Sequence, residues 1–321
     1  MTEHSIVDFK FIQQAHELIR PLIHRTEITT CDTLNRLAEA ELFFKCEHLQ
    51  KAGAFKSRGA CNAVFSLDHE NAQRGVVTHS SGNHAAALAR AGQMRDIPAH
   101  IVMPSNAPRV QVAAVKNYAG QITFCEPTLE SRESTAIRVQ QETEATFIHP
   151  YDNNQIIAGQ GTAAVELLED VPNLDVVIAP VGGGGLLSGT AIAAKALAPD
   201  IQVIAGEPEN ADDAYRSLQA GRVLPVERND TIADGLRTGL CERTFAIISR
   251  LVDDILLVEE DAILQAMQLL MERAKLVVEP SAAVPLGAVM SHREKFTGLR
   301  VGIILSGGNV DLTALPFSSQ R

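Results

Sequence analysis

The sequence has no tryptophan and little aromatic character. Aromatic residues make up only 4% of its 321 residues, while hydrophobic residues as a whole make up 45%. Aliphatic side chains and alanine must therefore fill the core, which suits helices packed on a parallel sheet. The chain is long enough for two domains or one large α/β domain.

Cysteine is scarce and scattered, and long apolar runs are missing. The five cysteines form no C-x-x-C pair, which disfavours a structural zinc site and a disulfide framework. The first ten residues show no basic segment followed by an apolar core, unlike a signal peptide. No apolar run approaches the roughly 20 residues of a membrane span. We therefore expect a cytoplasmic protein with reduced thiols and no membrane association.

Basic residues are outnumbered by acidic ones. There are 28 Lys and Arg against 39 Asp and Glu, which gives a net charge of -11 and a pI of about 5.4. This balance argues against a nucleic-acid-binding protein and against binding to anionic membranes, because both need basic patches. An anionic small molecule needs only local positive groups, so such a ligand is still compatible with the negative net charge.

Short apolar runs alternate with helical patterns between residues 75 and 147. This alternation predicts parallel strands joined by right-handed helical crossovers. We expect a small domain over residues 75–147 and a larger, discontinuous domain from residues 1–74 and 148–321. The cleft between two such units is a common ligand site. Outside the small domain, we expect a polar connection over residues 26–34 and a single helix over residues 260–275.

One lysine stretch, K-A-G-A-F-K-S-R-G at residues 51–59, organises the functional reading. Lys56 lies among small residues, with Lys51 and Arg58 as cationic neighbours. Burial and nearby cations favour the neutral, nucleophilic form of a lysine amine. By itself the stretch favours an ordinary solvated lysine, and only the rest of the chain strengthens the reactive alternative.

Four consecutive glycines, Gly182, Gly183, Gly184 and Gly185, connect a predicted strand with a predicted helix. Their backbone N–H groups can turn towards one anion at the positive end of the helix dipole. A tight turn is the alternative, but a turn needs one or two glycines, so a phosphate site is favoured. The spacing matches neither G-x-G-x-x-G nor a P-loop.

Two further turns follow predicted strands, S-S-G-N-H at residues 80–84 and S-G-G-N at residues 306–309. Open α/β sheets bind ligands beyond the carboxyl ends of their strands, so these turns and the glycine loop can converge on one cleft. For S-S-G-N-H, an anion site and a simple serine helix cap are about equally good. The acidic segment E-P-E-N-A-D-D at residues 207–213 favours a solvated loop by pattern alone, with a hard-cation site as the alternative.

The ordered set of motifs resembles the serine racemase and serine/threonine dehydratase family of fold-type-II pyridoxal-phosphate (PLP) enzymes, which includes threo-3-hydroxyaspartate ammonia-lyases. The motifs are F-K-S-R-G, S-S-G-N-H, V-G-G-G-G, E-P-E-N-A-D-D, T-I-A-D-G, V-V-E-P-S-A-A and L-S-G-G-N-V-D-L, and the match runs from about residue 15 to residue 313. The resemblance implies a fold like the tryptophan synthase β subunit. That fold has two open, twisted, mostly parallel sheets with flanking helices and an active site between a large and a small domain.

The resemblance also implies roles for single residues. Lys56 matches the lysine that binds PLP covalently, and Ser81 matches the hydroxyl that acts as acid and base in racemases. The cofactor-binding positions would be Phe55 on the ring, Asn83 on the phenolic oxygen, Gly182, Gly183, Gly184 and Gly185 on the phosphate, Ser306 on the pyridine nitrogen, and Gly235 and Glu279 along the ring. The substrate carboxylate would lie at Ser80, Ser81 and His84.

Two more positions follow from the resemblance. Glu207, Asp213 and the carbonyl of Ala211 match a divalent-cation site for Mg²⁺, with Ca²⁺ or Mn²⁺ as alternatives, which reverses the preference for a solvated loop. Arg132 matches an arginine near the substrate and would suit a second carboxylate, although a solvated helix arginine is an equally good interpretation. Ala86 stands where animal serine racemases have a glutamine that helps bind ATP.

The implied activity is β-elimination from L-serine, L-threonine or L-threo-3-hydroxyaspartate, giving an α-keto acid and ammonia, with racemase activity as a possible addition. A dedicated serine or aspartate racemase is the alternative within the family, and a non-catalytic metabolite-binding protein is a third hypothesis. The family also implies a homodimer acting on a small amino acid.

Overall fold

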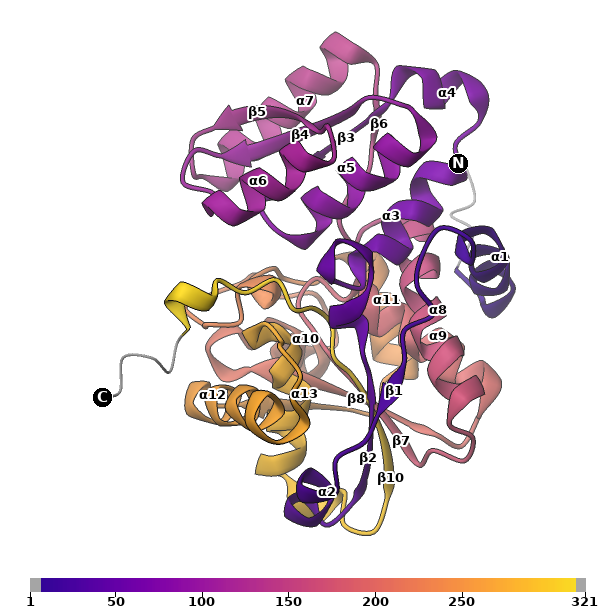
Figure 1. The fold of residues 1–321 in the computed structure, drawn as a ribbon, viewed down its shortest axis with the longest axis vertical. Coiled ribbons are helices and arrows are strands. Elements are labelled where there is room, and N and C mark those ends of the chain that lie inside the picture. Colours follow the sequence, from indigo (N-terminus) through magenta and orange to yellow (C-terminus); the bar gives the residue numbers. More distant parts are fainter. Residues whose placement is uncertain (1–6, 316–321) are drawn as a thin grey trace.

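Two separate β-sheets organise the structure, a computed structural model that describes residues 7–315 (Figure 1). The larger sheet has six strands in the order β1-β2-β10-β7-β8-β9, and only β1 runs antiparallel to its neighbour. Its strands are β1 (Ile28–Thr29), β2 (Glu41–Lys45), β7 (Val176–Pro180), β8 (Gln202–Pro208), β9 (Asp254–Val258) and β10 (Arg300–Ile304).

The smaller sheet is entirely parallel, with the strand order β5-β4-β3-β6. Its strands are β3 (Val76–His79), β4 (Ala99–Pro104), β5 (Gln121–Cys125) and β6 (Thr146–Phe147). They alternate with helices α5 (Asn83–Arg95), α6 (Arg109–Asn117) and α7 (Leu129–Thr143). The alternation predicted between residues 75 and 147 is therefore confirmed.

Both faces of the larger sheet are covered by helices, and β7 shows why its sequence is continuously apolar. All five of its residues are buried. Val176 and Ile178 pack into one core cluster with α12 (Glu260–Leu269) and α13 (Pro280–Ser291). Val177 and Ala179 pack on the opposite face, where α8 (Asn154–Asp170) and α9 (Gly185–Leu197) contribute to the core. A strand buried on both sides has no polar alternation to show.

Helix α3 (Lys56–Phe65) lies between the two sheets and contacts helices of both, α8 and α5 (Figure 1). Small residues permit its close approach to α8, because a Cβ on Gly59 would lie 2.8 Å from the Ile156 carbonyl oxygen. A Cβ on Gly159 would lie 2.6 Å from the Gly59 Cα. Since α3 joins both parts, domain boundaries at residues 74/75 and 147/148 stay a prediction.

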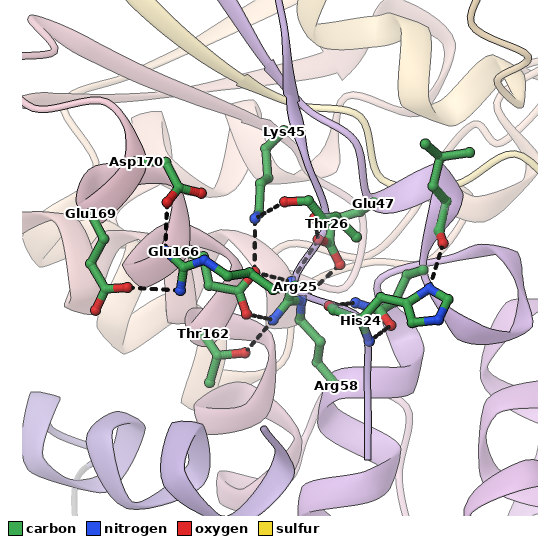
Figure 2. A network of polar contacts seen from close by, with 12 residues as sticks. His24, Arg25, Thr26, Lys45, Glu47, Arg58, Thr162, Glu166, Glu169 and Asp170 are labelled. Carbon is green, nitrogen blue, oxygen red and sulfur yellow. Dashed lines mark hydrogen bonds and ion pairs between the residues drawn. The ribbon is translucent and has the colours of Figure 1, made fainter. Parts of the chain in front are cut away.

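A buried ion network holds α3 to its neighbours (Figure 2). Arg58 donates from Nε to Glu47 at 2.7 Å and from Nη2 to Glu166 at 2.7 Å. Lys45 donates from Nζ to Glu166 at 2.7 Å and to the Thr26 carbonyl at 2.7 Å. Two positive and two negative side chains therefore balance one another, and they tie β2, α3 and α8 together.

The expected polar connection over residues 26–34 is wrong. The structure has strand β1 there and then helix α2 (Asp32–Ala38), whose Leu34 and Ala38 are fully buried. The threonines give this stretch a polar composition, so the short amphipathic helix was not predicted. The helix is followed by Glu39, which has a left-handed φ of 56°. The strand after it is fixed by Asn35, whose side-chain oxygen accepts from the Leu42 N–H at 3.1 Å.

The single helix expected over residues 260–275 is in fact two segments. Helix α12 ends at Leu269 and continues as a π-helical turn over Leu270–Ala274, which stops at Lys275 with a φ of 62°. Helices α4 (His69–Arg74) and α11 (Glu242–Leu251) were not anticipated. The remaining helices are α1 (Phe9–Ile19) and α10 (Asp213–Ala220).

No helix among residues 7–315 combines the length and apolar character needed to cross a membrane. The first six residues, which belong to the segment interpreted above as unlike a signal peptide, lie outside the described residues.

Candidate active site

The segment before α3 and the loops after β3 and β10 meet at one place. The Phe55 N–H donates to the Ser306 carbonyl at 2.9 Å, and the Gly308 N–H donates to the Gly53 carbonyl at 2.9 Å. The side chain of Asn83, the first residue of α5, donates to Glu279 at 2.9 and 3.0 Å. The structure therefore brings segments that are distant in the sequence into one cluster at the carboxyl ends of strands.

Lys56 is the first residue of α3 and faces this cluster. Its Nζ donates to the Pro150 carbonyl at 3.0 Å and lies 5.1 Å from the centroid of the Phe55 ring. Burial lowers the pKa of Lys56 to about 8, although the negative charge of Glu279 opposes the shift. A neutral amine is therefore accessible near pH 8, where an ordinary lysine remains almost wholly protonated.

Glu279 stands at the N-terminus of α13 and is only 5% exposed. Its backbone N–H donates to the Gly307 carbonyl at 3.0 Å, which ties α13 to the loop after β10. Burial raises the pKa of Glu279 to about 7, while the hydrogen bond from Asn83 opposes the shift. For both Lys56 and Glu279, desolvation thus shifts the pKa in the direction that disfavours the charged form.

The four glycines form the turn from β7 into α9, and all four are buried. Gly184 has a left-handed φ of 83°. A Cβ on Gly183 would lie 2.3 Å from the Tyr151 ring, and a Cβ on Gly182 would lie 2.9 Å from the Leu236 Cα. The turn therefore tolerates no side chains, and its N–H groups stand at the positive end of a 13-residue helix.

The turn at residues 80–84 is positioned by the end of β3 and the start of α5. The Gly82 N–H donates to the Ser80 hydroxyl at 3.3 Å. His84 is buried, and its Nε2 lies 3.2 Å from the Ile148 carbonyl. Since a carbonyl only accepts, Nε2 must carry the proton, and Nδ1 is an acceptor without a partner among the described residues.

The His84 ring is therefore unsuited to binding a carboxylate directly. Burial and the positive charge of Lys56 lower the pKa of His84 to about 3, so the ring stays neutral at physiological pH. At the start of α5 the Ala85 N–H already donates to the Gly82 carbonyl at 3.0 Å. The N–H groups of Asn83 and His84, however, precede the helical ladder and can serve an anion together with the hydroxyls of Ser80 and Ser81.

Arg132 belongs to α7, on the side of the smaller sheet. Its Nε is buried without a hydrogen-bond partner among residues 7–315. Burial lowers the pKa of His79, at the end of β3, and the charge of Arg132 lowers it further. Arg132 is thus close enough to the end of β3 to act on it electrostatically, and part of its guanidinium is unused.

Ser306 and Gly235 lie on the Glu279 side of the cluster. Ser306 follows β10 and is 2% exposed. The Gly235 N–H donates to Ser281 Oγ at 3.0 Å, which holds the turn at residues 234–236 against the first turn of α13. The negative charge of Asp234 in that turn also raises the pKa of Glu279.

Tyr151 and Asn309 lie in the site, but no role was predicted for either; Asn309 ends the S-G-G-N turn at residues 306–309, and Tyr151 lies outside the quoted motifs. The Tyr151 ring covers the glycine turn and meets the His149 ring edge-on, with 4.5 Å between centroids. Asn309 donates from Nδ2 to Asn83 Oδ1 at 2.9 Å. The available signal was positional, since both residues follow strands that end at the cluster.

Glu207 and Asp213, at the two ends of the acidic segment at residues 207–213, are buried, so the solvated loop favoured by its pattern is wrong for them, although Glu209 is exposed. Glu207 is fully buried and accepts from the N–H groups of Ala214 and Tyr215 at 2.8 Å each. Asp213 is 1% exposed; its Oδ2 accepts from the Leu240 N–H at 3.2 Å, and its Oδ1 has no partner among the described residues.

The electrostatics of this segment favour a cation. Burial raises the pKa of Glu207 well above its usual value and that of Asp213 to about 6. The Ala211 residue between them is also buried. Residues 7–315 contain no group of three or more His, Cys, Asp or Glu side chains arranged to hold a metal, so a cation here would also need carbonyl or water oxygens.

A cavity of about 290 Å³ adjoins the cluster on the far side of Asn309. Its walls come from residues 52–53, α5, α6 and Asn309, and Ala86 is among them. The methyl group of Ala86 offers no hydrogen bond to a ligand there.

The site has the properties of one that binds a phosphorylated carbonyl compound. Lys56 supplies an amine with a lowered pKa, the glycine turn supplies N–H groups where a Cβ would clash with Tyr151 or Leu236, and Asn83 supplies a side-chain donor. The residues present therefore fit PLP, which needs an amine for its aldehyde and N–H groups for its phosphate.

Comparison with known proteins gives the same result. Residues 19–307 match the family described as pyridoxal-phosphate dependent enzyme. The chain is 50% identical to a beta-hydroxyaspartate dehydratase of Paracoccus denitrificans over 304 residues, 95% of this chain and 96% of that protein. It is 49% identical to a serine racemase of Arabidopsis thaliana over 318 residues, 98% of this chain and 96% of that protein.

A solved structure agrees with these relatives. The structure of maize serine racemase superposes with a TM-score of 0.95 at 48% identity, covering 97% of this chain and 96% of that one. The chain belongs to the family of pyridoxal-phosphate-dependent enzymes, and its fold is fold type II, as the motifs predicted.

Proposed function

We propose that this enzyme catalyses β-elimination from a β-hydroxy amino acid, releasing water and then ammonia to leave an α-keto acid. The observation that carries the proposal is Lys56, a buried amine with a lowered pKa that donates to the Pro150 carbonyl, next to Tyr151, whose ring covers the glycine turn. The similarity to a beta-hydroxyaspartate dehydratase supports elimination, and the similarity to serine racemases supports a racemase as the second candidate.

The cofactor-binding residues follow from the positions described above. The phosphate would be held by the N–H groups of Gly182, Gly183, Gly184 and Gly185, and the ring would lie among Phe55, Asn83, Gly235, Glu279 and Ser306. Bound PLP supplies an electron sink for the negative charge that develops at the substrate α-carbon.

Lys56 would act as the base that removes the α-proton. Its lowered pKa leaves about half of the amine neutral near pH 8, so it can accept this proton. The electron pair of the Cα–H bond then forms a Cα–Cβ double bond, and the Cβ–O bond breaks. The hydroxyl takes up a proton, for which the protonated Lys56 is a source, and leaves as water. A water molecule then hydrolyses the released enamine to the keto acid and ammonia.

The substrate carboxylate would lie at the start of α5, held by Ser80, Ser81 and the backbone N–H of His84. In the racemase alternative, Ser81 would return a proton to the opposite face of the α-carbon. Arg132 would bind a second carboxylate, as in L-threo-3-hydroxyaspartate, because its Nε lacks a partner among residues 7–315.

A divalent cation, Mg²⁺ or alternatively Ca²⁺ or Mn²⁺, would bind at Glu207, Asp213 and the carbonyl of Ala211. The unpartnered Oδ1 of Asp213 and the raised carboxyl pKa values support it, since a cation stabilises the charged forms. The proposed assembly is a homodimer, on the strength of the family resemblance, and the proposed location is the cytoplasm, on the strength of the sequence features described first.

The test is turnover of L-serine, L-threonine and L-threo-3-hydroxyaspartate, each assayed separately with PLP and Mg²⁺. Keto acid and both enantiomers of the remaining substrate are measured, with and without EDTA. Keto acid formed fastest from hydroxyaspartate and reduced by EDTA supports elimination, the role of Arg132 and the cation site together. Accumulation of D-serine with little pyruvate supports the racemase instead.

Two variants separate the parts of this proposal. Arg132→Leu raises KM for hydroxyaspartate more than for serine if the guanidinium binds the second carboxylate. Ser81→Ala suppresses racemisation more than elimination if Ser81 is the second acid/base group. Absence of turnover with all three substrates contradicts the proposed substrate class.

A further inference from the structure

A chain of side-chain amides crosses the site beside Lys56. Asn309 donates from Nδ2 to the Ala52 carbonyl at 2.8 Å and to Asn83 Oδ1 at 2.9 Å. Asn83 in turn donates from Nδ2 to Oε1 and Oε2 of Glu279 at 2.9 and 3.0 Å. Four distant segments are joined in this way, and each bond has a defined direction.

The backbone carbonyl of Ala52 sets that direction. The nitrogen and oxygen of an asparagine amide have nearly the same shape, so only their partners decide which way the group points. A carbonyl accepts and never donates, so Ala52 must face the nitrogen of Asn309. The second hydrogen of that nitrogen then needs an acceptor, and this selects the oxygen of Asn83. The nitrogen of Asn83 is left to point towards Glu279.

The backbone around Asn309 holds it firmly in this position. The Gly308 N–H bonds to the Gly53 carbonyl at 2.9 Å, and Ala54 and Gly307 form a β-bridge. A Cβ on Gly53 would lie 2.3 Å from Asn309 Oδ1, so the asparagine packs directly against a glycine. Ala52 itself has a left-handed φ of 55°, an uncommon conformation for alanine. The carbonyl that sets the direction is therefore fixed at a specific backbone geometry.

We propose that Asn309 is a positioning residue that keeps the side-chain nitrogen of Asn83, rather than its oxygen, turned towards the cofactor. The inference rests on the proposed function, in which Asn83 contacts the phenolic oxygen of PLP. A donor at that place stabilises the deprotonated ring oxygen, whereas an acceptor repels it and favours its protonated form.

The orientation also matters for Glu279. With its nitrogen turned towards the cofactor and Glu279, Asn83 donates to a buried carboxyl group and keeps part of it ionised. A reversed amide would place an oxygen against that carboxyl group, and both the carboxylate and the phenolate would then lack a donor.

The decisive variant is Asn309→Asp, which keeps the shape of the side chain and removes its donors. The carboxylate introduced by this substitution can only accept hydrogen bonds, so the amide of Asn83 is expected to rotate and turn its oxygen inward. We expect the affinity of the full-length apoprotein for PLP to fall about tenfold. The absorbance of bound PLP should shift from the band of the deprotonated ring oxygen towards that of the protonated one.

Two matched variants make the result specific. Asn309→Ala removes the donors without introducing an acceptor, so both changes should be smaller than with Asn309→Asp. Asn62→Asp makes the same chemical change at a buried asparagine on α3, whose Nδ2 donates to the Gln155 carbonyl at 2.8 Å. This control should lower stability and leave PLP affinity and absorbance unchanged.

Asn83→Ala separates this inference from the proposed function. If Asn83→Ala changes PLP affinity and absorbance while Asn309→Asp behaves like Asn309→Ala or the wild type, the inference about Asn309 is overturned and the assignment of Asn83 stands. If Asn83→Ala changes neither, both are overturned. Should Asn309→Asp fail to fold, Asn309→Ala decides the matter, because unchanged affinity and absorbance in that variant contradict the proposal.

Discussion

Two lysines eleven residues apart in sequence have opposite surroundings. Lys45 is fully buried and bonds to both the Glu166 carboxylate and the Thr26 carbonyl at 2.7 Å (Figure 2). Lys56 bonds to the Pro150 carbonyl at 3.0 Å, without a carboxylate in salt-bridge contact among the described residues. Lys45 is thus paired with a carboxylate, whereas Lys56 has a lowered pKa and an amine that can lose its proton.

The same contrast extends to the neighbours of the two lysines. In the buried network, hydrogen bonds and opposite charges raise the pKa of Arg58 and lower that of Glu166 despite burial. Around Lys56, burial outweighs the available partners, so the pKa of Glu279 rises to about 7. Burial alone therefore does not shift a pKa towards neutrality. Burial does so when the charged group lacks enough opposite charges and hydrogen bonds to offset the loss of water.

The largest expected effect comes from removing the reactive lysine. Lys56→Ala should lower keto-acid production by about 10⁴-fold, because no other amine replaces the base. The variant should remain folded, since Lys56 makes no ion pair within residues 7–315. Turnover and circular dichroism on the purified protein check both statements.

Lys45→Met is the matched control for this prediction. It replaces the lysine of the buried ion network by a side chain of similar length without a charge. The variant should therefore be less stable, while its folded fraction keeps its activity. Full activity in Lys56→Ala, or loss of activity in folded Lys45→Met, would contradict the contrast between the two sites.

The next effect is on stability and comes from Arg58. Arg58→Met leaves Glu47 buried without its ion-pair partner, and Glu166 keeps only Lys45. We expect the free energy of unfolding of the apoprotein to fall by about 3–5 kcal/mol. Urea unfolding measures this loss, and Arg138→Met, in an exposed pair with Glu142, should cost less than about 0.5 kcal/mol. Equal costs for the two variants would show that the buried network does not hold α3.

A smaller effect concerns the pH dependence set by Glu279. Below about pH 4.5 the carboxyl group is protonated in both folded and unfolded chains. Between pH 4.5 and about 7 the unfolded chain loses this proton while the folded protein keeps it, so stability falls as pH rises. Glu279→Gln should remove this fall, which amounts to about 3 kcal/mol from the size of the shift.

Urea unfolding of the wild-type and Glu279→Gln apoproteins at several pH values tests this prediction. The difference between the two proteins should change across pH 4.5 to 7 and be constant outside that window. Asp213 also titrates in the acidic part of this range, but it is common to both proteins and cancels in the difference. A constant difference throughout would mean that Glu279 has an ordinary pKa.

The smallest expected effect is that of the proposed cation. Removing it with EDTA should lower the free energy of unfolding by about 1–3 kcal/mol, because a ligand bound only to the folded state stabilises it. Asp213→Asn should abolish the response to EDTA, since it removes the unpartnered carboxylate oxygen. Thermal unfolding with and without Mg²⁺ measures both, and an equal EDTA effect in the variant would place the cation elsewhere.

Much of the fold could be predicted because its patterns are local. Strand β7 could be predicted from a continuous apolar run before four glycines. The small sheet could be predicted from the regular alternation of apolar runs with helical patterns. Helix α2 was missed because its seven residues include only three apolar ones, and its burial depends on the sheet behind it. The acidic segment at residues 207–213 was misjudged by pattern for a similar reason, since Glu207 and Asp213 give no local sign of their burial.

The sequence by itself determined the family and singled out Lys56 and the glycine turn, because these depend on residue types at fixed spacing. The tertiary structure decided which polar groups are paired. Arg58 belongs to a closed ion network and Lys56 does not, although only one residue separates them. It also decided that Asn309 meets Asn83, because this contact joins residues 226 positions apart. Pairing depends on which distant segments share a buried space, and that becomes fixed only when the two sheets and α3 are packed together.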